Sequence, residues 1–305
     1  MKIVRSLEAL VGNTPLYEIT SYQLPPQVRL FAKLEFFNPG GSIKDRLGFY
    51  LLKQAIKTGT IKKGDTVIEA TAGNTGIGLA LAAIHYGLKV IFITPEKFSI
   101  EKQSLMRALG AKVVNTPTKD GMQGAIDKAK EMAKEIPHAY IANQFHNQWN
   151  PDTYYETLGP EIYDALDGKV DIFIAGAGSG GTFTGVSKFL KEQNQQIKTV
   201  VVEPEGSILN GGEPGPHRTE GIGLEFLPPY MDPTYFDKIY TITDEQAFSR
   251  VAEIAKQEGL LVGSSSGAVL EAALQEASLA KPGTNIVTIF PDSSERYMST
   301  GIYGE

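Results

Sequence analysis

Short apolar runs rich in β-branched residues alternate with segments of helical periodicity along most of the chain. The runs that predict strands are residues 66–69, 89–93, 112–114, 170–174, 199–202 and 285–290. Helices are predicted between them, among others at residues 77–84, 122–135 and 245–257. Buried strands that alternate with helices are typical of parallel sheets covered by helices. The pattern therefore predicts an α/β fold with largely parallel sheets.

Two irregular stretches interrupt this alternation. Residues 143–152 are polar and contain the only tryptophan, Trp149, so we predict a boundary between two lobes near them. Residues 204–233 are rich in glycine and proline and are longer than most connections between regular elements. Because regular elements resume on both sides, the second stretch is predicted to be a functional loop region rather than a linker.

Composition narrows the class of protein. The 305 residues are 42% hydrophobic and 21% charged, as in folded globular proteins, and no apolar run reaches the length that a bilayer requires. The N-terminal residues lack the features of a signal peptide, so the expected location is the cytoplasm. The absence of cysteine excludes disulfides, thiolate metal sites and a cysteine nucleophile, and the four histidines are too scattered to indicate a metal site. A formal net charge of -6 without a basic cluster argues against nucleic acid as a partner.

One lysine, Lys44, stands between the glycine-rich turn at residues 38–41 and a predicted helix start. A lysine held in such a place is partly desolvated, and burial lowers the pKa of a lysine because it disfavours the charged form. The neutral amine can attack a carbonyl group and form an imine. Lys44 is therefore a candidate nucleophile, although lysines beside turns are more often solvated surface residues.

The strand predicted at residues 170–174 runs into a glycine-rich loop and then a helix. The loop contains Gly178, Ser179, Gly180, Gly181 and Thr182. Its backbone N–H groups, the helix N-terminus and the two hydroxyls would bind a phosphate group. No lysine stands where a Walker motif requires one. The alternative is a tight turn that only packs a helix on a sheet.

The same glycines leave a different class of protein open. Gly176, Gly178 and Gly181 satisfy the pattern G-x-G-x-x-G, and Glu203 ends the next strand, where an acid that binds ribose would stand. A dinucleotide-binding dehydrogenase is therefore an alternative. Against it, a complete α/β region precedes the motif, and nicotinamide chemistry gives Lys44 no role.

Two further loops join a predicted strand to a helix start. Residues 71–76, Thr-Ala-Gly-Asn-Thr-Gly, would hold a carboxylate through backbone N–H groups and hydroxyls, and the Asn74 amide would donate to a phenolate oxygen. Residues 261–267 offer three serines at another helix start, where N-capping is the alternative role. Asp292 and Glu295 are candidates for hydrogen bonding to this serine loop, and exposure to solvent explains them equally well.

A lysine able to form an imine, a carboxylate cradle, an uncharged phosphate cradle and a serine turn are together what pyridoxal phosphate requires. The chain resembles the cysteine synthase and cystathionine β-synthase family of fold type II pyridoxal-phosphate enzymes, from Val-Gly-Asn-Thr-Pro-Leu at residues 11–16 to Pro-Asp-Ser-Ser-Glu-Arg-Tyr at residues 291–297. The resemblance implies an α/β fold like that of the tryptophan synthase β-subunit, with two lobes and the cofactor between them. It places residues 40–147 in a smaller mobile lobe and residues 1–39 and 148–305 in a larger lobe that carries the phosphate loop, without a regulatory domain.

The resemblance also assigns roles to individual residues. Lys44 would bind pyridoxal 5′-phosphate and later remove the substrate α-proton, while Asn74 would contact the cofactor 3′-oxygen and Ser265 its pyridine nitrogen. A neutral serine does not keep that nitrogen protonated, which favours β-elimination over transamination. The residues that would hold the phosphate are Gly178, Ser179, Gly180, Gly181 and Thr182. The residues that would bind the substrate carboxylate are Thr71, Ala72, Gly73, Thr75 and Gln144, and Gly221 would line the path by which substrates reach the site.

Two departures from the family pattern bear on substrate choice. Ala72 stands where most members have serine, so one hydroxyl contact to the carboxylate is absent. Leu224 and Glu225 stand where cysteine synthases that use sulfide usually have Ala-Gly, whereas cystathionine synthases have a bulky residue followed by an acid. Glu225 would receive the amino group of homocysteine, which sulfide lacks. The alternative is that Glu225 is a solvated loop carboxylate.

The resulting prediction is a β-replacement that forms L-cystathionine from O-acetyl-L-serine, or serine, and L-homocysteine in cysteine biosynthesis. O-acetylserine is the expected donor because the chain resembles bacterial versions without a haem segment, and acetate leaves without the protonation that hydroxide needs. A cysteine synthase that uses sulfide is the alternative, and a silent partner-binding protein is disfavoured because every proposed cofactor residue is present. A homodimer that acts on small amino acids is expected, with neither membrane nor nucleic acid as a partner. The sequence leaves open the acceptor, the donor and any contact with serine acetyltransferase.

Overall fold

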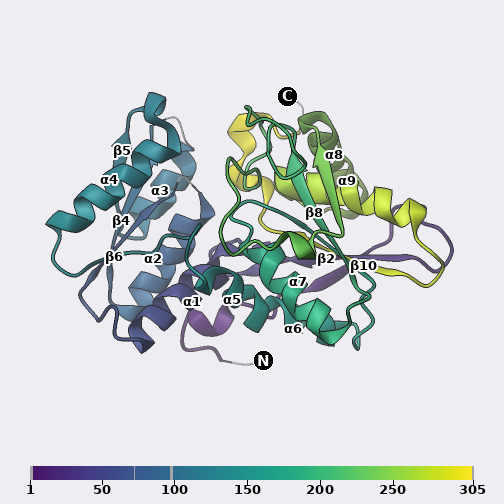
Figure 1. Ribbon diagram of the computed structural model, residues 1–305, viewed down its shortest axis with the longest axis horizontal. Helices are drawn as coiled ribbons and strands as arrows, with labels where there is room; N and C mark the ends of the chain where they lie inside the picture. Colours follow the sequence, from purple (N-terminus) through teal and green to yellow (C-terminus); the bar gives the residue numbers. More distant parts are fainter. Residues whose placement is uncertain (1–2, 72, 97–98, 304–305) are drawn as a thin grey trace. The chain divides into compact units, whose positions relative to one another are not determined.

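The computed structural model describes residues 3–71, 73–96 and 99–303, and the chain divides into two compact units (Figure 1). Unit 1 comprises Met1–Val11 and Asn38–Trp149, and unit 2 comprises Gly12–Phe37 and Asn150–Glu305. Sequence analysis assigned residues 1–39 as a whole to the larger lobe, whereas the segment up to Val11 belongs to unit 1. The Glu8 carboxylate explains this placement, because it forms an ion pair with Lys53 (3.1 Å) and lies 3.2 Å from His85 Nε2, both in unit 1.

Unit 1 is built on a four-stranded parallel sheet in the order β5-β4-β3-β6. Helix α4 packs on one face of this sheet over buried aliphatic side chains. The strands are β3 (Thr66–Ala70), β4 (Lys89–Pro95), β5 (Lys112–Thr116) and β6 (Ala139–Ile141). The helices are α1 (Lys44–Lys57), α2 (Asn74–Tyr86), α3 (Ile100–Ala108) and α4 (Gly121–Glu135), with short 3-10 turns at Glu8–Leu10 and Thr118–Asp120.

Helices α1 and α2 cross closely because glycines lie at their contact. A methyl group on Gly48 would clash with the backbone of Gly78, and one on Gly78 would clash with the carbonyl of Lys44. The two backbones can therefore approach to a distance that larger residues would prevent. This contact holds the first residue of α1 against α2.

Unit 2 contains a six-stranded sheet in the order β1-β2-β10-β7-β8-β9. Strand β1 runs antiparallel to β2, and all other neighbours are parallel. The strands are β1 (Leu16–Ile19), β2 (Arg29–Leu34), β7 (Ile172–Gly176), β8 (Lys198–Pro204), β9 (Lys238–Ile242) and β10 (Asn285–Phe290). The helices are α5 (Trp149–Glu156), α6 (Leu158–Ala165), α7 (Gly181–Gln193), α8 (Asp244–Glu258) and α9 (Ser264–Leu279), with 3-10 turns at Glu35–Phe37, Pro233–Tyr235, Ser294–Arg296 and Met298–Thr300.

The main core of unit 2 joins its sheet to helices α8 and α9. Val200 of β8, Val251 of α8 and Val269 of α9 are buried together in it. Helix α8 begins with a capping box, in which Thr243 Oγ1 accepts the N–H of Gln246 (3.2 Å) and the Gln246 side chain accepts the N–H of Thr243 (3.0 Å). The capping box thus gives hydrogen-bond acceptors to two backbone N–H groups at the start of α8.

The α/β fold with largely parallel sheets is confirmed. The six predicted strands correspond to β3, β4, β5, β7, β8 and β10, and the helices predicted at residues 77–84, 122–135 and 245–257 lie within α2, α4 and α8. Strands β1, β2, β6 and β9 were not predicted. Residues 205–232 contain neither helix nor strand. Within the described ranges, no helix combines the length and the apolar character needed to cross a membrane.

Candidate active site

Lys44 is the first residue of α1 in unit 1, and Ser42 and Ile43 separate it from the turn at residues 38–41. The N–H of Gly41 closes the turn with a hydrogen bond of 2.8 Å to the carbonyl of residue 38. The φ of Gly41 is 74°, a conformation that glycine adopts without strain. The buried carboxylate of Asp45 accepts a hydrogen bond from another N–H of the turn, and the N–H of Lys44 donates to the Ser42 hydroxyl over 3.2 Å. The backbone of Lys44 is therefore held from both sides, and its side chain is partly exposed.

The loop after β3 forms a polar cradle with a turn from farther along the chain. Thr75 Oγ1 donates to Gln144 Oε1 over 2.8 Å, and both side chains are buried. Within the loop, the N–H of Gly73 donates to Thr71 Oγ1 over 3.3 Å. A methyl group on Gly73 would meet no atom within 4 Å, so the loop opens onto space on that side. The predicted site residue Ala72 lies outside the described residues.

Sequence analysis missed a carboxylate behind this cradle. Glu69 is buried and accepts the N–H groups of Asn143 (2.6 Å) and Gln144 (3.2 Å). Burial raises its pKa to about 7, although these two bonds act in the opposite direction. The available signal was an acid near the end of an apolar strand, because a buried strand retains an acid only where hydrogen bonds compensate it.

Three of the predicted loops lead into helix N-termini: α2 begins at Asn74, α7 at Gly181 and α9 at Ser264. None of these helices has an acidic residue in its first turn. The first N–H groups of a helix have no partner within the helix, and its N-terminus carries partial positive charge. Each of these loops therefore favours an anionic or electron-rich ligand group.

The predicted phosphate loop, residues 178–182, connects β7 to α7 in unit 2. Gly180 has a φ of 81°, and a methyl group on Gly178 would clash with the carbonyl of Gly221. Ser179 is buried, whereas Thr182 is partly exposed. The loop therefore needs glycine both for its turn and for its contact with the segment around residue 221.

Two side chains that sequence analysis missed hold the phosphate loop in place. Asn150 Nδ2 donates to Ser179 Oγ (3.0 Å) and to the Tyr230 hydroxyl (3.0 Å). The Tyr230 hydroxyl in turn donates to the carbonyl of Ser179 over 2.7 Å. The side chain of Met231 lies against Gly180, where a methyl group would clash. The long irregular segment thus braces the loop, a role that nothing in its local sequence indicates.

The serine loop at the start of α9 is backed by Asp292. The N–H of Gly263 donates to the Asp292 carbonyl over 3.1 Å, and the Asp292 carboxylate accepts a hydrogen bond from the Tyr297 hydroxyl. Both side chains are buried, and burial raises the pKa of Tyr297 well above its usual value. Ser265 is buried as well. Of the two acids considered from the sequence, Asp292 belongs to the surroundings of the serine loop, whereas Glu295 is exposed.

Residues 217–226, here called the access segment, pack against both loops of unit 2. A methyl group on Gly221 would lie 3.8 Å from Ser265 Oγ. The N–H of Gly223 donates over 2.8 Å to the carbonyl that follows β7. Glu225 is exposed on this segment. Unit 2 therefore brings together the phosphate loop, the serine loop and the access segment.

Glu203, the acid whose position suggested ribose binding, has a structural role. Glu203 is buried, and its carboxylate accepts the N–H groups of Leu209 (2.8 Å) and Asn210 (3.0 Å) and the hydroxyl of Thr241 (3.0 Å). These bonds hold the start of the irregular segment. They argue against the dinucleotide alternative, because the carboxylate oxygens serve the fold.

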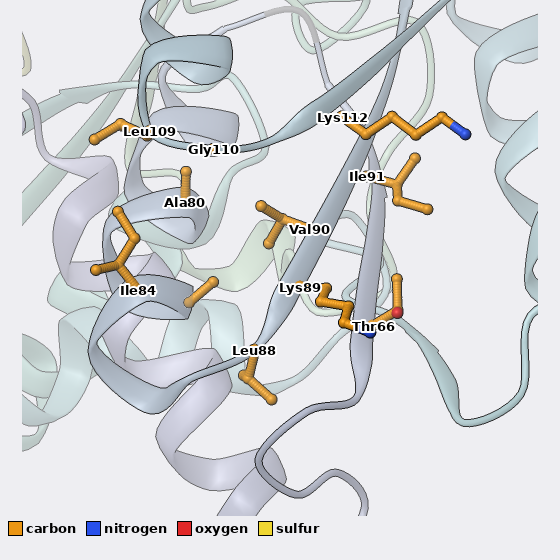
Figure 2. Close-up of a pocket in the computed structure, with 11 residues that line it drawn as sticks. Thr66, Ala80, Ile84, Leu88, Lys89, Val90, Ile91, Leu109, Gly110 and Lys112 are labelled. Carbon is orange, nitrogen blue, oxygen red and sulfur yellow. The ribbon is translucent and has the colours of Figure 1, made fainter.

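A groove of about 370 Å³ lies in unit 1, where strands β3, β4 and β5 begin (Figure 2). Its lining includes Thr66, Lys89 and Lys112, the first residues of β3, β4 and β5. The predicted carboxylate cradle follows the opposite, carboxyl end of β3. The groove contains no predicted site residue.

Comparisons with known proteins agree with this arrangement. Residues 7–292 match the family described as "Pyridoxal-phosphate dependent enzyme". The chain is 60% identical over 303 residues to the O-acetylserine dependent cystathionine beta-synthase of Bacillus subtilis (strain 168), covering 99% of both proteins. It is 54% identical over 305 residues to a cysteine synthase of Helicobacter pylori (strain ATCC 700392 / 26695), covering 99% of this chain and 100% of the relative. The solved structure of the O-acetylserine dependent cystathionine beta-synthase from Helicobacter pylori has a TM-score of 0.96 at 54% identity and covers 99% of this chain and 100% of that one.

Proposed function

Because the chain belongs to the family of pyridoxal-phosphate-dependent enzymes, we propose that it replaces the acetate of O-acetyl-L-serine with L-homocysteine, forming L-cystathionine. Both the family and the fold type II architecture were predicted from the sequence and are confirmed. The observation that carries the proposal is the hydrogen bond between Thr75 and Gln144, which joins two segments of unit 1 at the place proposed to bind the amino acid. The name of the relative that is 60% identical supports the same donor and product.

The side chains fit pyridoxal 5′-phosphate. Residues 178–182 offer backbone N–H groups and the Thr182 hydroxyl at the start of a 13-residue helix, which suits a phosphate dianion. Ser265 offers an uncharged hydroxyl to the pyridine nitrogen, Asn74 offers an amide to the 3′-oxygen, and Lys44 offers the amine for covalent attachment. When bound, this cofactor supplies a ring that withdraws electron density from the substrate α-carbon.

Lys44 carries the proton transfers of the proposed reaction. Its amine takes the proton from the substrate α-carbon, and acetate then leaves Cβ with the electron pair of the C–O bond. The homocysteine thiol releases its proton to solvent, its sulfur forms the new bond to Cβ, and Lys44 returns to the α-carbon the proton that it took. The neutral hydroxyl of Ser265 favours this elimination over transamination, because it does not keep the pyridine nitrogen protonated.

The substrate carboxylate is assigned to the cradle of unit 1. The Thr75 and Gln144 side chains and the backbone N–H groups around Gly73 would hold it, and the start of α2 adds partial positive charge. Ala72 belongs to the same proposed site. Gly221 would line the path by which substrates reach it.

Glu225 is proposed to select homocysteine as the acceptor. Its carboxylate is exposed on the access segment, next to the buried Leu224, and an amino group would pair with it. Sulfide has no amino group, so this contact would favour homocysteine. Cysteine synthesis from sulfide is the second candidate, because the relatives at 54% and 42% identity include cysteine synthases.

The visible absorption spectrum of the purified holoenzyme, before and after addition of O-acetyl-L-serine, tests the cofactor and the donor together. A visible band that moves to longer wavelength supports the proposal, and a competition between homocysteine and sulfide then identifies the product. A band that does not move points to serine or another donor. A protein that shows no band after pyridoxal phosphate has been supplied would overturn the proposal.

We also propose that the protein works on small amino acids as a homodimer in the cytoplasm. Light scattering of the purified protein tests the assembly. A mass near twice the 33.1 kDa of one chain supports the dimer, and a mass of one chain contradicts it.

A further inference from the structure

Glu69 is the last residue but one of β3, and it faces away from the core that β3 forms with α4. Ile68 and Ala70 belong to that core together with Ala125 and Ala129 of α4. Because successive side chains of a strand point to opposite faces, Glu69 lies on the other face, where it is buried as well. A carboxylate in such a place persists only where hydrogen bonds compensate its lost hydration.

Two successive backbone N–H groups supply that compensation. Glu69 Oε2 accepts the N–H of Asn143 (2.6 Å), and Oε1 accepts the N–H of Gln144 (3.2 Å). Asn143 has a φ of 52°, in the left-handed region that costs free energy for residues other than glycine. Glu69 therefore clamps the strained turn that follows β6.

The clamped turn carries Gln144 into the carboxylate cradle. Gln144 Oε1 accepts the hydrogen bond from Thr75 over 2.8 Å. Glu69 also stands only two residues before Thr71, the first residue of the loop that forms the other wall. Glu69 thus connects both walls of the cradle: its side chain binds the turn that carries Gln144, and its backbone leads into the loop that begins at Thr71.

We propose that Glu69 is a positioning residue for the amino-acid substrate: its paired bonds to residues 143 and 144 hold Gln144 against Thr75 in the geometry that receives the substrate carboxylate. The inference rests on the proposed function, because it requires that the cradle binds an amino acid. Glu69 acts through Gln144 and does not itself take part in the chemistry.

Protonation of Glu69 changes the strength of this clamp. Its pKa of about 7 means that it loses its charge near neutral pH, and a neutral carboxyl accepts N–H bonds more weakly than a carboxylate. Among the described residues, Tyr140 on β6 is a titratable neighbour that stays neutral because its pKa is about 12, and the residue opposite Glu69 on β4 is the uncharged Phe92. Substrate affinity is therefore expected to fall as the pH is lowered through about 7.

The test compares Glu69→Gln with Glu258→Gln in the holoenzyme and in the apoprotein. Glu258 is a matched control because it also accepts two successive backbone N–H groups, those of Thr20 and Ser21 (both 2.8 Å), in a turn of unit 2 with no assigned site role. In the holoenzyme, a spectral titration with O-acetyl-L-serine gives the dissociation constant, and steady-state kinetics separate kcat from KM. In the apoprotein, amide hydrogen exchange of residues 143 and 144 reports on the clamp without reference to activity.

We expect Glu69→Gln to weaken amino-acid binding and raise KM about tenfold, the cost of one charge-assisted bond, while kcat changes less than about threefold. Exchange at residues 143 and 144 becomes faster, the part of the affinity change that follows the titration of Glu69 near pH 7 disappears, and cofactor absorbance is preserved. Glu258→Gln is expected to match wild type in every one of these readouts. Should Glu69→Gln fail to fold, Glu69→Asp keeps the charge on a shorter arm and is expected to weaken binding in the same direction.

Wild-type affinity in a folded Glu69 variant would overturn the inference, and so would wild-type exchange at residues 143 and 144. If the wild-type holoenzyme binds no amino acid, the proposed function fails and the inference fails with it. Faster exchange in the Glu69→Gln apoprotein would then still demonstrate the clamp, so the two failures are distinguishable.

Discussion

The hydroxyl of Thr75 donates a hydrogen bond of 2.8 Å to the side chain of Gln144, 69 residues farther along the chain. Thr75 lies in the first turn of α2, directly after the loop that follows β3, and Gln144 lies in the turn that follows β6. Because β3 and β6 are parallel neighbours, their carboxyl ends meet at one edge of the sheet. The two polar side chains therefore converge where a substrate carboxylate is proposed to bind.

Removal of the Thr75 hydroxyl should weaken this cradle without changing its shape. Thr75→Val is expected to weaken O-acetyl-L-serine binding about tenfold, because the buried hydrogen bond that joins the two segments of the cradle is lost. A spectral titration of the holoenzyme measures the affinity. Thr58→Val is the control, since Thr58 donates to the Gln54 carbonyl at the exposed end of α1. Equal affinities of wild type and Thr75→Val would contradict the assignment of the cradle.

Replacement of Lys44 should abolish both covalent cofactor binding and turnover. Lys44→Ala is expected to lose the visible band of the holoenzyme and to lower kcat by at least about 1,000-fold, because no other group is assigned to either step. Absorption spectra and a product assay measure the two effects. Lys57→Ala, at the exposed end of the same helix, should retain both. Turnover by Lys44→Ala near the wild-type rate would refute the proposed role.

The brace between Tyr230 and the phosphate loop should affect cofactor affinity. Tyr230→Phe removes the bond of 2.7 Å to the Ser179 carbonyl and is expected to weaken pyridoxal phosphate binding to the apoprotein about fivefold. Tyr155→Phe is the control, because the Tyr155 hydroxyl donates to Glu192 at an exposed position. Fluorescence titration gives both affinities. A Tyr230→Phe protein that binds the cofactor as tightly as wild type would show that the brace is not needed for phosphate binding.

The acceptor assignment depends on Glu225. Glu225→Gly is expected to reduce the preference for homocysteine over sulfide about tenfold, since an ion pair with the amino group of homocysteine is lost. The ratio of cystathionine to cysteine formed in a mixture of the two acceptors measures the preference. The exposed Glu295 offers a control, Glu295→Gly, which should not alter this ratio. An unchanged ratio in Glu225→Gly would reject the assignment.

Glu69 should also make the free energy of unfolding depend on pH. Its pKa is about 7 in the folded protein against 4.5 for the ordinary group, so the folded state favours the protonated form. The resulting stabilisation is complete below pH 4.5 and is lost as the pH rises through about 7, a change of about 3 kcal/mol at most. Denaturant unfolding of wild type and Glu69→Gln between pH 4.5 and 8 measures it. The free energy of unfolding of wild type should fall relative to that of the variant as the pH rises, and parallel curves would contradict the shifted pKa.

Local sequence indicated the α/β pattern and the loops of this protein, although strands β1, β2, β6 and β9 were not predicted. Apolar β-branched runs indicated six of the strands, and five of these, all but the edge strand β5, are buried along most of their length, where apolar residues are needed throughout. Glycines and hydroxyls between strand and helix marked the loops at residues 71–76, 178–182 and 261–267. The family followed from these motifs and from the position of Lys44, since their chemistry is encoded within a few consecutive residues.

The tertiary structure alone decided which side chains support those loops. Glu69 clamps the turn that carries Gln144, and Asn150 and Tyr230 brace Ser179. Each of these hydrogen bonds joins residues that are far apart in the sequence. A carboxylate, an amide or a phenol can also have many different roles, so its presence in the sequence does not indicate its partner. Their hydrogen bonds become strong because packing buries them and fixes their separation, and burial and separation are properties of the folded chain rather than of any short segment.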